Sequence, residues 1–283
     1  MIHQYKSNGY NIVMDVESGA VHVVDDVTYD VIALFEDTET SKIVEQLSDK
    51  YDKADIEEAI SEVNQLKEDG QLFTQDIYQP FIEEFKDKRQ TVVKALCLHI
   101  AHDCNLACKY CFAEEGEYHG RRAMMSFEVG KKALDFLVAN SGSRVNLEVD
   151  FFGGEPLMNW DVVKQLVEYG RSLEESNHKK FRFTLTTNGV LLNDEIMEYL
   201  NKEMSNVVLS LDGRKEVNDR MRPFRTGKGS YDLIVPKFQK LAESRNQSNY
   251  YVRGTFTRDN LDFSEDVKHF ADLGFKQMSI EPV

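Results

Sequence analysis

The sequence predicts an α/β fold, a six-stranded partial (β/α)6 barrel of the TIM type, preceded by a small winged-helix-like α+β domain. Two observations predict this. Over residues 1–75, three strand-like runs come before three helix-like runs. From residue 91 onward, six strand patterns alternate with helix patterns, which is typical of a parallel sheet covered by helices. A doubly wound sheet is the alternative arrangement of the same units.

The small domain is predicted to begin with three strands joined by tight turns. The turns are Ser7-Asn8-Gly9 and Glu17-Ser18-Gly19, and the strands are expected at 3–6, 10–15 and 20–24. Apolar residues at helical spacing then predict helices at 26–35, after Thr38 or Thr40, and at 55–69. Residues 76–90 combine mixed charge with aromatic side chains and are expected to form a helical linker.

The larger domain, residues 91–283, divides into strand-and-helix units. The expected strands lie at 91–100, 144–152, 180–187, 206–211, 249–257 and 276–280. The expected helices lie at 126–140, 160–176, 194–201, 231–244 and 264–273. Because the chemistry of βα folds collects at the carboxyl ends of the strands, the segments that follow the strands are the candidate site segments.

The charge of the chain excludes one class of partner. The net charge is −15, and residues 1–75 hold 17 acidic residues against five lysines and no arginine. Phosphate backbones need Lys and Arg for neutralisation, so nucleic acid is not an expected partner. No apolar run reaches the length of about 18 residues that a membrane span needs. The N-terminus has no signal-peptide pattern, so the protein is predicted to be cytoplasmic, where thiols stay reduced.

Three cysteines, Cys104, Cys108 and Cys111, follow the first strand of the larger domain with C-x3-C-x2-C spacing. Three thiolates on one loop hold an iron–sulfur cluster at three of its four irons and leave the fourth open for another ligand. Cys97 lies within the predicted strand and is expected to be a small buried core residue. The alternative is structural zinc, with His99, His102 or His119 as the fourth ligand.

The cysteine loop, with Tyr110 just before its last cysteine, resembles the signature of the radical S-adenosylmethionine (SAM) enzymes. The resemblance implies the partial barrel, a [4Fe–4S] cluster on the three cysteines, and SAM on the open iron as the source of a 5′-deoxyadenosyl radical. Further motifs of this family follow later strands. The residues that the resemblance assigns to SAM binding are Tyr110, Gly153, Gly154, Glu155, Pro156, Asn188, Ser210 and Arg222. Asp212 is a weaker candidate of the same kind, and Arg253 and Thr255 are expected to face the barrel interior.

The order of the motifs resembles the SPASM-type peptide maturases, most closely the clostridial six-cysteine peptide (SCIFF) maturases. Residues 1–75 resemble the RiPP recognition element, which holds the leader of a ribosomally made precursor peptide on the third strand, 20–24, and the later helix. The resemblance implies a sactisynthase-like reaction that joins a cysteine sulfur to a carbon of another residue as a thioether. It also implies an electron donor such as ferredoxin or flavodoxin. A packing or oligomerisation role for residues 1–75 is the alternative.

The chain departs from these maturases in one respect, since no cysteine follows Cys111. Auxiliary iron–sulfur clusters are therefore expected only in a C-terminal region absent from this sequence, which is expected to be a fragment. No residue is assigned as the catalytic base. The alternative functions are a formylglycine-forming sulfatase-type maturase and a zinc-stabilised peptide-binding adaptor.

Overall fold

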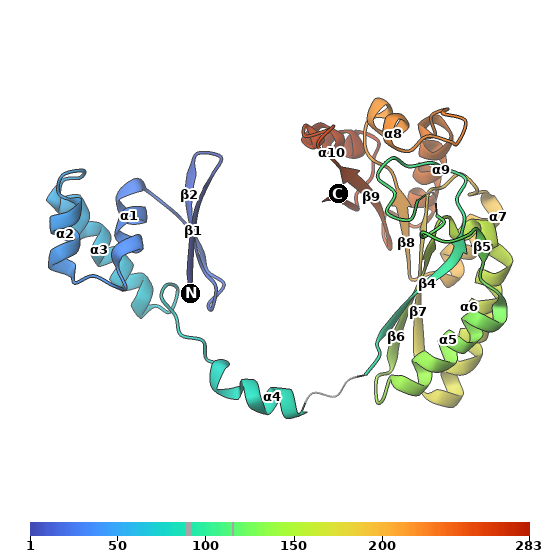
Figure 1. The fold of residues 1–283 in the computed structure, drawn as a ribbon, viewed down its shortest axis with the longest axis horizontal. Coiled ribbons are helices and arrows are strands. Elements are labelled where there is room, and N and C mark those ends of the chain that lie inside the picture. Colours follow the sequence, from blue (N-terminus) through green and yellow to red (C-terminus); the bar gives the residue numbers. More distant parts are fainter. Residues whose placement is uncertain (89–91, 115) are drawn as a thin grey trace. The chain divides into compact units, whose positions relative to one another are not determined.

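The computed structural model of the protein describes residues 1–88, 92–114 and 116–283. The chain divides into two units, Met1–Gln90 and Thr91–Val283 (Figure 1), and each unit has a hydrophobic core of its own. No helix of the described residues is both long and apolar enough to cross a membrane.

Unit 1 is a three-stranded antiparallel sheet packed against three helices, in the predicted order. The strands are β1 (Ile2–Ser7), β2 (Tyr10–Asp15) and β3 (Val21–Val24), and β2 lies in the centre. The helices are α1 (Asp26–Leu34), α2 (Thr40–Leu47) and α3 (Lys53–Glu68). The apolar stripe predicted for the last helix is buried at Ile56, Ile60 and Val63, against Val13 of the sheet.

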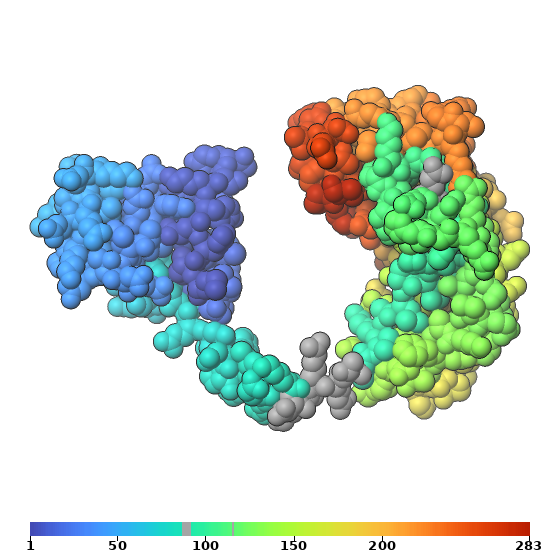
Figure 2. Space-filling view, viewed as in Figure 1, coloured from blue at the N-terminus to red at the C-terminus, as the bar shows by residue number. Residues whose placement is uncertain are grey.

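The predicted linker is only partly helical in the described residues. A 3-10 helix, η1 (Gln79–Phe81), leads into α4 (Ile82–Lys88), and residues 89 and 90 lie outside the described part of the chain. This segment belongs to the teal part of the chain in Figure 2. Its apolar side chains are exposed, among them Ile77, Tyr78, Phe81 and Phe85.

Unit 2 is a seven-stranded, mostly parallel sheet covered by helices. The strands in spatial order are β10 (Met278–Pro282), β9 (Tyr250–Phe256), β8 (Asn206–Ser210), β7 (Lys180–Thr187), β6 (Asn146–Gly153), β4 (Ala95–His102) and β5 (Ala123–Met124). All pairs are parallel except β4 with β5. Among the parallel strands, the spatial order from β4 through β6 to β10 follows the chain order, without the reversal that defines a doubly wound sheet. The predicted α/β fold is therefore confirmed, and the sheet is consistent with a partial TIM barrel.

The longer helices of unit 2 pack against the apolar face of this sheet. They are α5 (Phe127–Asn140), α6 (Trp160–Asn177), α7 (Asp194–Glu203), α9 (Tyr231–Ser244) and α10 (Phe263–Asp272). The short helix α8 (Lys215–Met221) contacts α9, and a 3-10 turn η2 (Pro156–Asn159) precedes α6. Figure 1 shows α5 and α6 on the same side of β4, β6 and β7. Along the strands, alternate residues such as Val149, Phe151 and Phe183 are fully buried beneath these helices. The residues between them face the other side of the sheet.

Unit 2 differs from the sequence-based expectations in three respects. The first strand was expected at 91–100 but runs from Ala95 to His102, and residue 91 lies outside the described residues. The short strand β5 and the helix α8 were not predicted, because neither has enough residues to show a period. Cys97 is exposed rather than buried in the core, since Leu98 and Ile100 take the helix-covered face of β4 and leave Cys97 on the opposite face.

Candidate functional site

A cavity of about 260 Å³ lies at the carboxyl ends of the parallel strands of unit 2. Nine of the predicted cofactor residues line it, and they are Cys104, Cys108, Cys111, Tyr110, Gly153, Gly154, Asn188, Ser210 and Arg222. Arg253 and Thr255, which were expected in the barrel interior, line it as well. Other lining residues, such as Thr186 and Thr187, were not assigned. The structure therefore gathers segments that are more than 100 residues apart in the sequence.

The cysteine loop is held in place by backbone contacts with a distant segment. The N–H of Ala107 donates to the carbonyl of Pro223 (2.8 Å), and the N–H of Lys109 donates to the carbonyl of Met221 (2.9 Å). These two bonds flank Arg222, so they bring its side chain beneath the loop. No sequence pattern indicates this pairing, because backbone groups of any residue can form it.

The two glycines after β6 are required by the close approach of the cysteine loop. The N–H of Gly154 donates to the carbonyl of Ala101 (2.7 Å), and the N–H of Glu155 donates to the carbonyl of Asp103 (2.9 Å). A Cβ atom on Gly154 would lie 2.0 Å from the Asp103 carbonyl oxygen. A Cβ atom on Gly153, whose φ is +127°, would lie 2.5 Å from the Ala101 carbonyl oxygen. Only glycine therefore lets the loop pack here.

Glu155 and Pro156 do not line the cavity, although the sequence assigned them to SAM binding. The Glu155 carboxylate is buried and accepts hydrogen bonds from Leu157 N (3.0 Å), Thr187 Oγ1 (2.8 Å) and Asn188 N (2.8 Å). Burial raises the pKa of Glu155 to about 7, against the lowering effect of these hydrogen bonds. Pro156 is buried at the start of η2. In this structure Glu155 joins the end of β6 to the end of β7.

A buried chain of polar groups connects the cysteine loop to β8. The Tyr110 hydroxyl donates to the Asp212 carboxylate (2.8 Å to Oδ2), and Arg222 Nη1 donates to the Tyr110 oxygen (2.6 Å). Asp212 is fully buried and Arg222 is 8% exposed. Burial raises the pKa values of both Asp212 and Tyr110, with Arg222 opposing the rise.

Arg222 is a buried cation with unused hydrogen-bonding capacity. Within the described residues it forms no ion pair shorter than 4.0 Å, and its Nε atom is buried without a hydrogen-bond partner. A buried charge without a partner is costly, so this arrangement favours an anionic ligand in the cavity. A carboxylate would suit the planar guanidinium fork.

The cysteine thiols lie in surroundings that disfavour free thiolates. Burial raises the pKa of Cys104 to about 12 and also raises the pKa of Cys108. Bound iron would supply the positive charge that deprotonates such thiols. No three His, Cys, Asp or Glu side chains in the described parts of the chain converge on one metal-ion position.

The sequence profile described as the radical SAM superfamily matches residues 98–279. This chain belongs to the radical SAM superfamily. The match begins within β4, ends within β10 and includes every residue that the resemblance assigned to the cluster and to SAM. The superfamily implies a [4Fe–4S] cluster and SAM, and the zinc-stabilised adaptor is therefore wrong.

Several curated proteins are similar to this chain. An uncharacterised protein of Methanocaldococcus jannaschii is 30% identical over 67% of this chain and 62% of its own length. The radical SAM cyclopropyl synthase TigE of Paramaledivibacter caminithermalis is 27% identical over 63% of this chain and 39% of its own length. A cysteine-type anaerobic sulfatase-maturating enzyme of Clostridium novyi is 28% identical over 52% of this chain and 40% of its own length. This chain thus spans less than two thirds of these curated relatives.

Two solved structures show the same fold. Native anSMEcpe with bound AdoMet and a Kp18Cys peptide has a TM-score of 0.60 at 22% identity, over 68% of this chain and 51% of that chain. SuiB of Streptococcus suis has a TM-score of 0.52 at 17% identity, over 99% of this chain and 61% of that chain.

The radical SAM site of this chain fits its implied cofactors. Cys104, Cys108 and Cys111 would hold the cluster, and the unpaired face of Arg222, together with Ser210, would hold the carboxylate of SAM. The candidate zinc ligands do not line the cavity. His99 and His102 contact the ring of Tyr118, with centroids 4.4 and 4.8 Å apart, and His119 pairs with Glu114.

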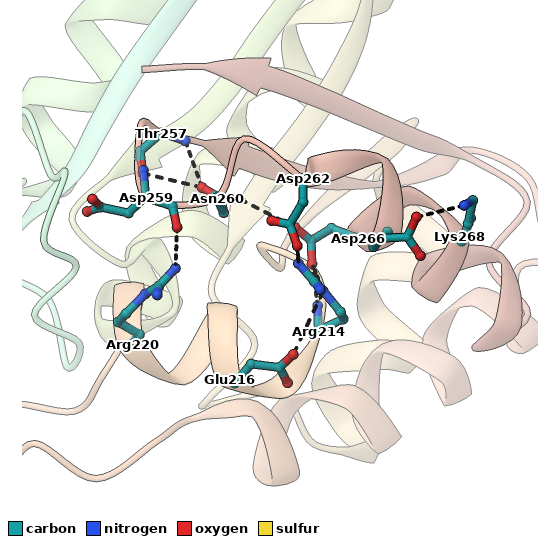
Figure 3. A network of polar contacts seen from close by, with 10 residues as sticks. Arg214, Glu216, Arg220, Thr257, Asp259, Asn260, Asp262, Asp266 and Lys268 are labelled. Atoms are coloured by element: carbon teal, nitrogen blue, oxygen red, sulfur yellow. Dashed lines mark hydrogen bonds and ion pairs between the residues drawn. The ribbon is translucent and has the colours of Figure 1, made fainter.

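A second polar network joins Arg214, in the turn after β8, to α10, and no sequence pattern indicated it (Figure 3). Arg214 donates from its backbone N (3.0 Å) and its Nε (2.8 Å) to the buried Asp266 of α10. Gly213, between Asp212 and Arg214, has φ +118°, and a Cβ atom there would lie 2.3 Å from Asp266. The hydrogen bonds of Arg214 therefore hold the turn after β8 against α10. The resemblance pointed to Asp212, but no pattern pointed to Asp266.

Proposed function

We propose that this radical SAM enzyme modifies a ribosomally synthesised, cysteine-rich peptide and forms a thioether between a cysteine sulfur and a carbon of another residue. The observation that carries the proposal is the combination, in one chain, of a radical SAM cavity in unit 2 and a peptide-sized groove in unit 1. The similarity to anSMEcpe, which was solved with bound AdoMet and a peptide, supports it. The activity of the whole protein is part of the proposal, since this chain spans only part of those relatives.

The groove of unit 1 has a volume of about 430 Å³ and runs between β3 and α3. Its lining residues are Val21, His22, Val23, Val24, Asp25, Thr28, Glu62 and Leu66. Among the described strands, β3 pairs only with β2, so its other edge has backbone groups available for strand addition. Val21 and Val23 are 59% and 65% exposed. These features support a winged-helix-like recognition element that binds an extended leader segment.

The groove is acidic, which indicates the charge of the leader. Glu62 lies on the same face of α3 as Asp55 and Glu58, at helical spacings of seven and four residues. All three are exposed, and no ion pair with them occurs among the described residues. We therefore propose a leader with Lys or Arg residues opposite α3.

The overall reaction removes two hydrogen atoms from the peptide. Bound cluster and SAM would supply the 5′-deoxyadenosyl radical that takes one hydrogen atom from a substrate carbon. A C–H bond and an S–H bond break and a C–S bond forms, so a proton and one electron also leave the substrate. We propose an auxiliary iron–sulfur cluster outside this sequence as the electron acceptor, and ferredoxin or flavodoxin as the donor that starts the reaction. Within this chain, the cavity residues bind and orient SAM and exclude water.

A sulfatase-type maturase is the second candidate function. The similarity to the Clostridium novyi enzyme and to anSMEcpe favours it. Such an enzyme would convert one cysteine or serine to formylglycine rather than join two residues. The products differ, so one assay separates the two reactions.

The test is an anaerobic reaction of reconstituted protein, extended to the C-terminal region if its gene encodes one, with SAM, a strong reductant and the precursor peptide. Mass spectrometry would measure 5′-deoxyadenosine and the peptide. We expect 5′-deoxyadenosine and a peptide that has lost two hydrogen atoms and one alkylatable thiol. In Cys108→Ala neither product should form. A peptide with an aldehyde in place of a thiol would overturn the thioether and support formylglycine formation.

A further inference from the structure

Asn188 is held in one orientation at the end of β7. Its backbone N–H donates to Glu155 Oε2 (2.8 Å), and its side-chain Oδ1 accepts from Val190 N (3.0 Å). The residue is only 5% exposed. With the carbonyl side of the amide occupied, the NH2 group can point in only one direction.

That NH2 group points at the cysteine loop. Asn188 Nδ2 lies 2.8 Å from Asn105 Oδ1 and 3.5 Å from Cys104 Sγ, so each of its two N–H groups has an acceptor. The backbone N–H of Leu106 also donates to Cys104 Sγ, at 3.5 Å. Among the described residues, no side-chain hydrogen bond to the sulfur atoms of Cys108 or Cys111 occurs. Cys104 is thus the cysteine whose sulfur is hydrogen-bonded from outside its own loop.

We propose that Asn188 is a positioning residue that donates an N–H···S hydrogen bond to Cys104 and thereby raises the reduction potential of the iron–sulfur cluster. The proposal rests on the assignment of the cluster to Cys104, Cys108 and Cys111. Reduction adds negative charge to a cluster and its thiolates, and a hydrogen-bond donor to a thiolate sulfur stabilises the more negative state. Glu155 acts behind Asn188, because it accepts hydrogen bonds from the Thr187 hydroxyl and the Asn188 backbone N–H and so fixes where the amide lies.

This role differs from the contact with SAM that the sequence assigned to Asn188. A residue that only binds SAM would leave the potential of the SAM-free cluster unchanged. A residue that donates to Cys104 changes that potential whether SAM is present or not. The two roles therefore predict different results in one measurement.

The experiment is a redox titration of the reconstituted cluster without SAM, followed by electron paramagnetic resonance, in wild type, Asn188→Ala and Asn188→Asp. Asn188→Asp keeps the Oδ1 acceptor of the turn but loses the donor and adds negative charge. We expect more negative midpoint potentials in both variants, with the larger shift in Asn188→Asp. The matched control is Asn105→Ala, which removes the other acceptor of Nδ2 and should keep the wild-type potential.

An unchanged potential in both Asn188 variants, with normal iron content, would overturn the proposal. A shift in Asn105→Ala as large as in Asn188→Ala would also overturn it, because the effect would then come from loop disorder. If Asn188→Ala does not fold, Asn188→Asp decides alone. Failure of the cluster assignment is a separate outcome, since wild type itself would then show no cluster signal.

Discussion

At the scale of single residues, the site depends on buried polar groups that satisfy one another. Tyr110 accepts from Arg222 and donates to Asp212, so one phenol serves a cation and an anion that are otherwise not paired with each other. Glu155 has a similar function on the other side of the cavity, where one carboxylate holds three donors. Tyr110 and Glu155 therefore influence ligand binding by orienting the residues that they contact.

Tyr110→Phe is expected to weaken SAM binding. The change removes the hydroxyl that donates to Asp212 Oδ2 and accepts from Arg222 Nη1. Each buried polar group left unsatisfied costs about 1–3 kcal/mol. We expect a fall in SAM affinity of roughly tenfold, equivalent to about 1.4 kcal/mol. Equilibrium binding of SAM to the reconstituted protein measures it. The control is Tyr231→Phe, whose hydroxyl contacts His269 away from the cavity. Wild-type affinity in Tyr110→Phe would contradict the role of the phenol.

The ionisation of Glu155 predicts a pH dependence of stability. Burial raises its pKa from 4.5 to about 7, so folding favours the protonated carboxyl. Its contribution to the free energy of unfolding is fully present below pH 4.5 and is lost as the pH rises towards 7. We expect urea denaturation to show this decline, by up to about 3 kcal/mol, in wild type but not in Glu155→Gln. Parallel pH curves for the two proteins would show that Glu155 does not titrate in this range.

At the scale of elements, each proposed functional surface lies where the edge or the end of a strand is not covered by a neighbouring element. The free edge of β3 and the acidic face of α3 form the groove of unit 1. In unit 2, the cavity lies at the strand ends. The segment 221–224, which begins at the last residue of α8, is hydrogen-bonded to the cysteine loop. Short elements such as α8 carry little periodicity, yet they decide where Arg222 lies.

The acidic face of α3 predicts a charge-dependent leader affinity. Glu62→Lys is expected to weaken binding of a Lys- or Arg-bearing leader peptide several-fold, and the difference should shrink at high salt, because exposed charges are screened. Fluorescence anisotropy of a labelled leader measures this. Glu45→Lys on α2 makes the same charge change outside the groove and is the matched control. Equal losses in both variants would show that only the net charge of unit 1 matters.

At the scale of the whole molecule, two units with separate cores share one chain. All the apolar residues of the larger core lie in unit 2, and all those of the smaller core lie in unit 1. Each unit therefore has the contacts that its own folding needs. The proposed function divides in the same way, into recognition of the leader and cleavage of SAM.

Deletion of residues 1–75 is expected to abolish leader binding while SAM cleavage without peptide continues at a rate within about twofold of wild type. The physical reason is that the cavity takes none of its lining residues from unit 1. Leader affinity and 5′-deoxyadenosine formation in the truncated protein measure the two halves of this prediction. Unchanged leader affinity would place recognition elsewhere in the chain.

The sequence by itself determined the α/β fold class, most of the element boundaries and the three cysteines, because periodicity, turn residues and close spacing along the chain are local properties. β7 and α9 lie at the predicted residues, and seven of the predicted side chains line one cavity. Only the tertiary structure decided which residues line the cavity. It separated Glu155 and Pro156 from the cavity, exposed Cys97, paired the cysteine loop with 221–224 and aimed Asn188 at Cys104. These are contacts between distant segments, often through the backbone, and the packing of strand ends determines them.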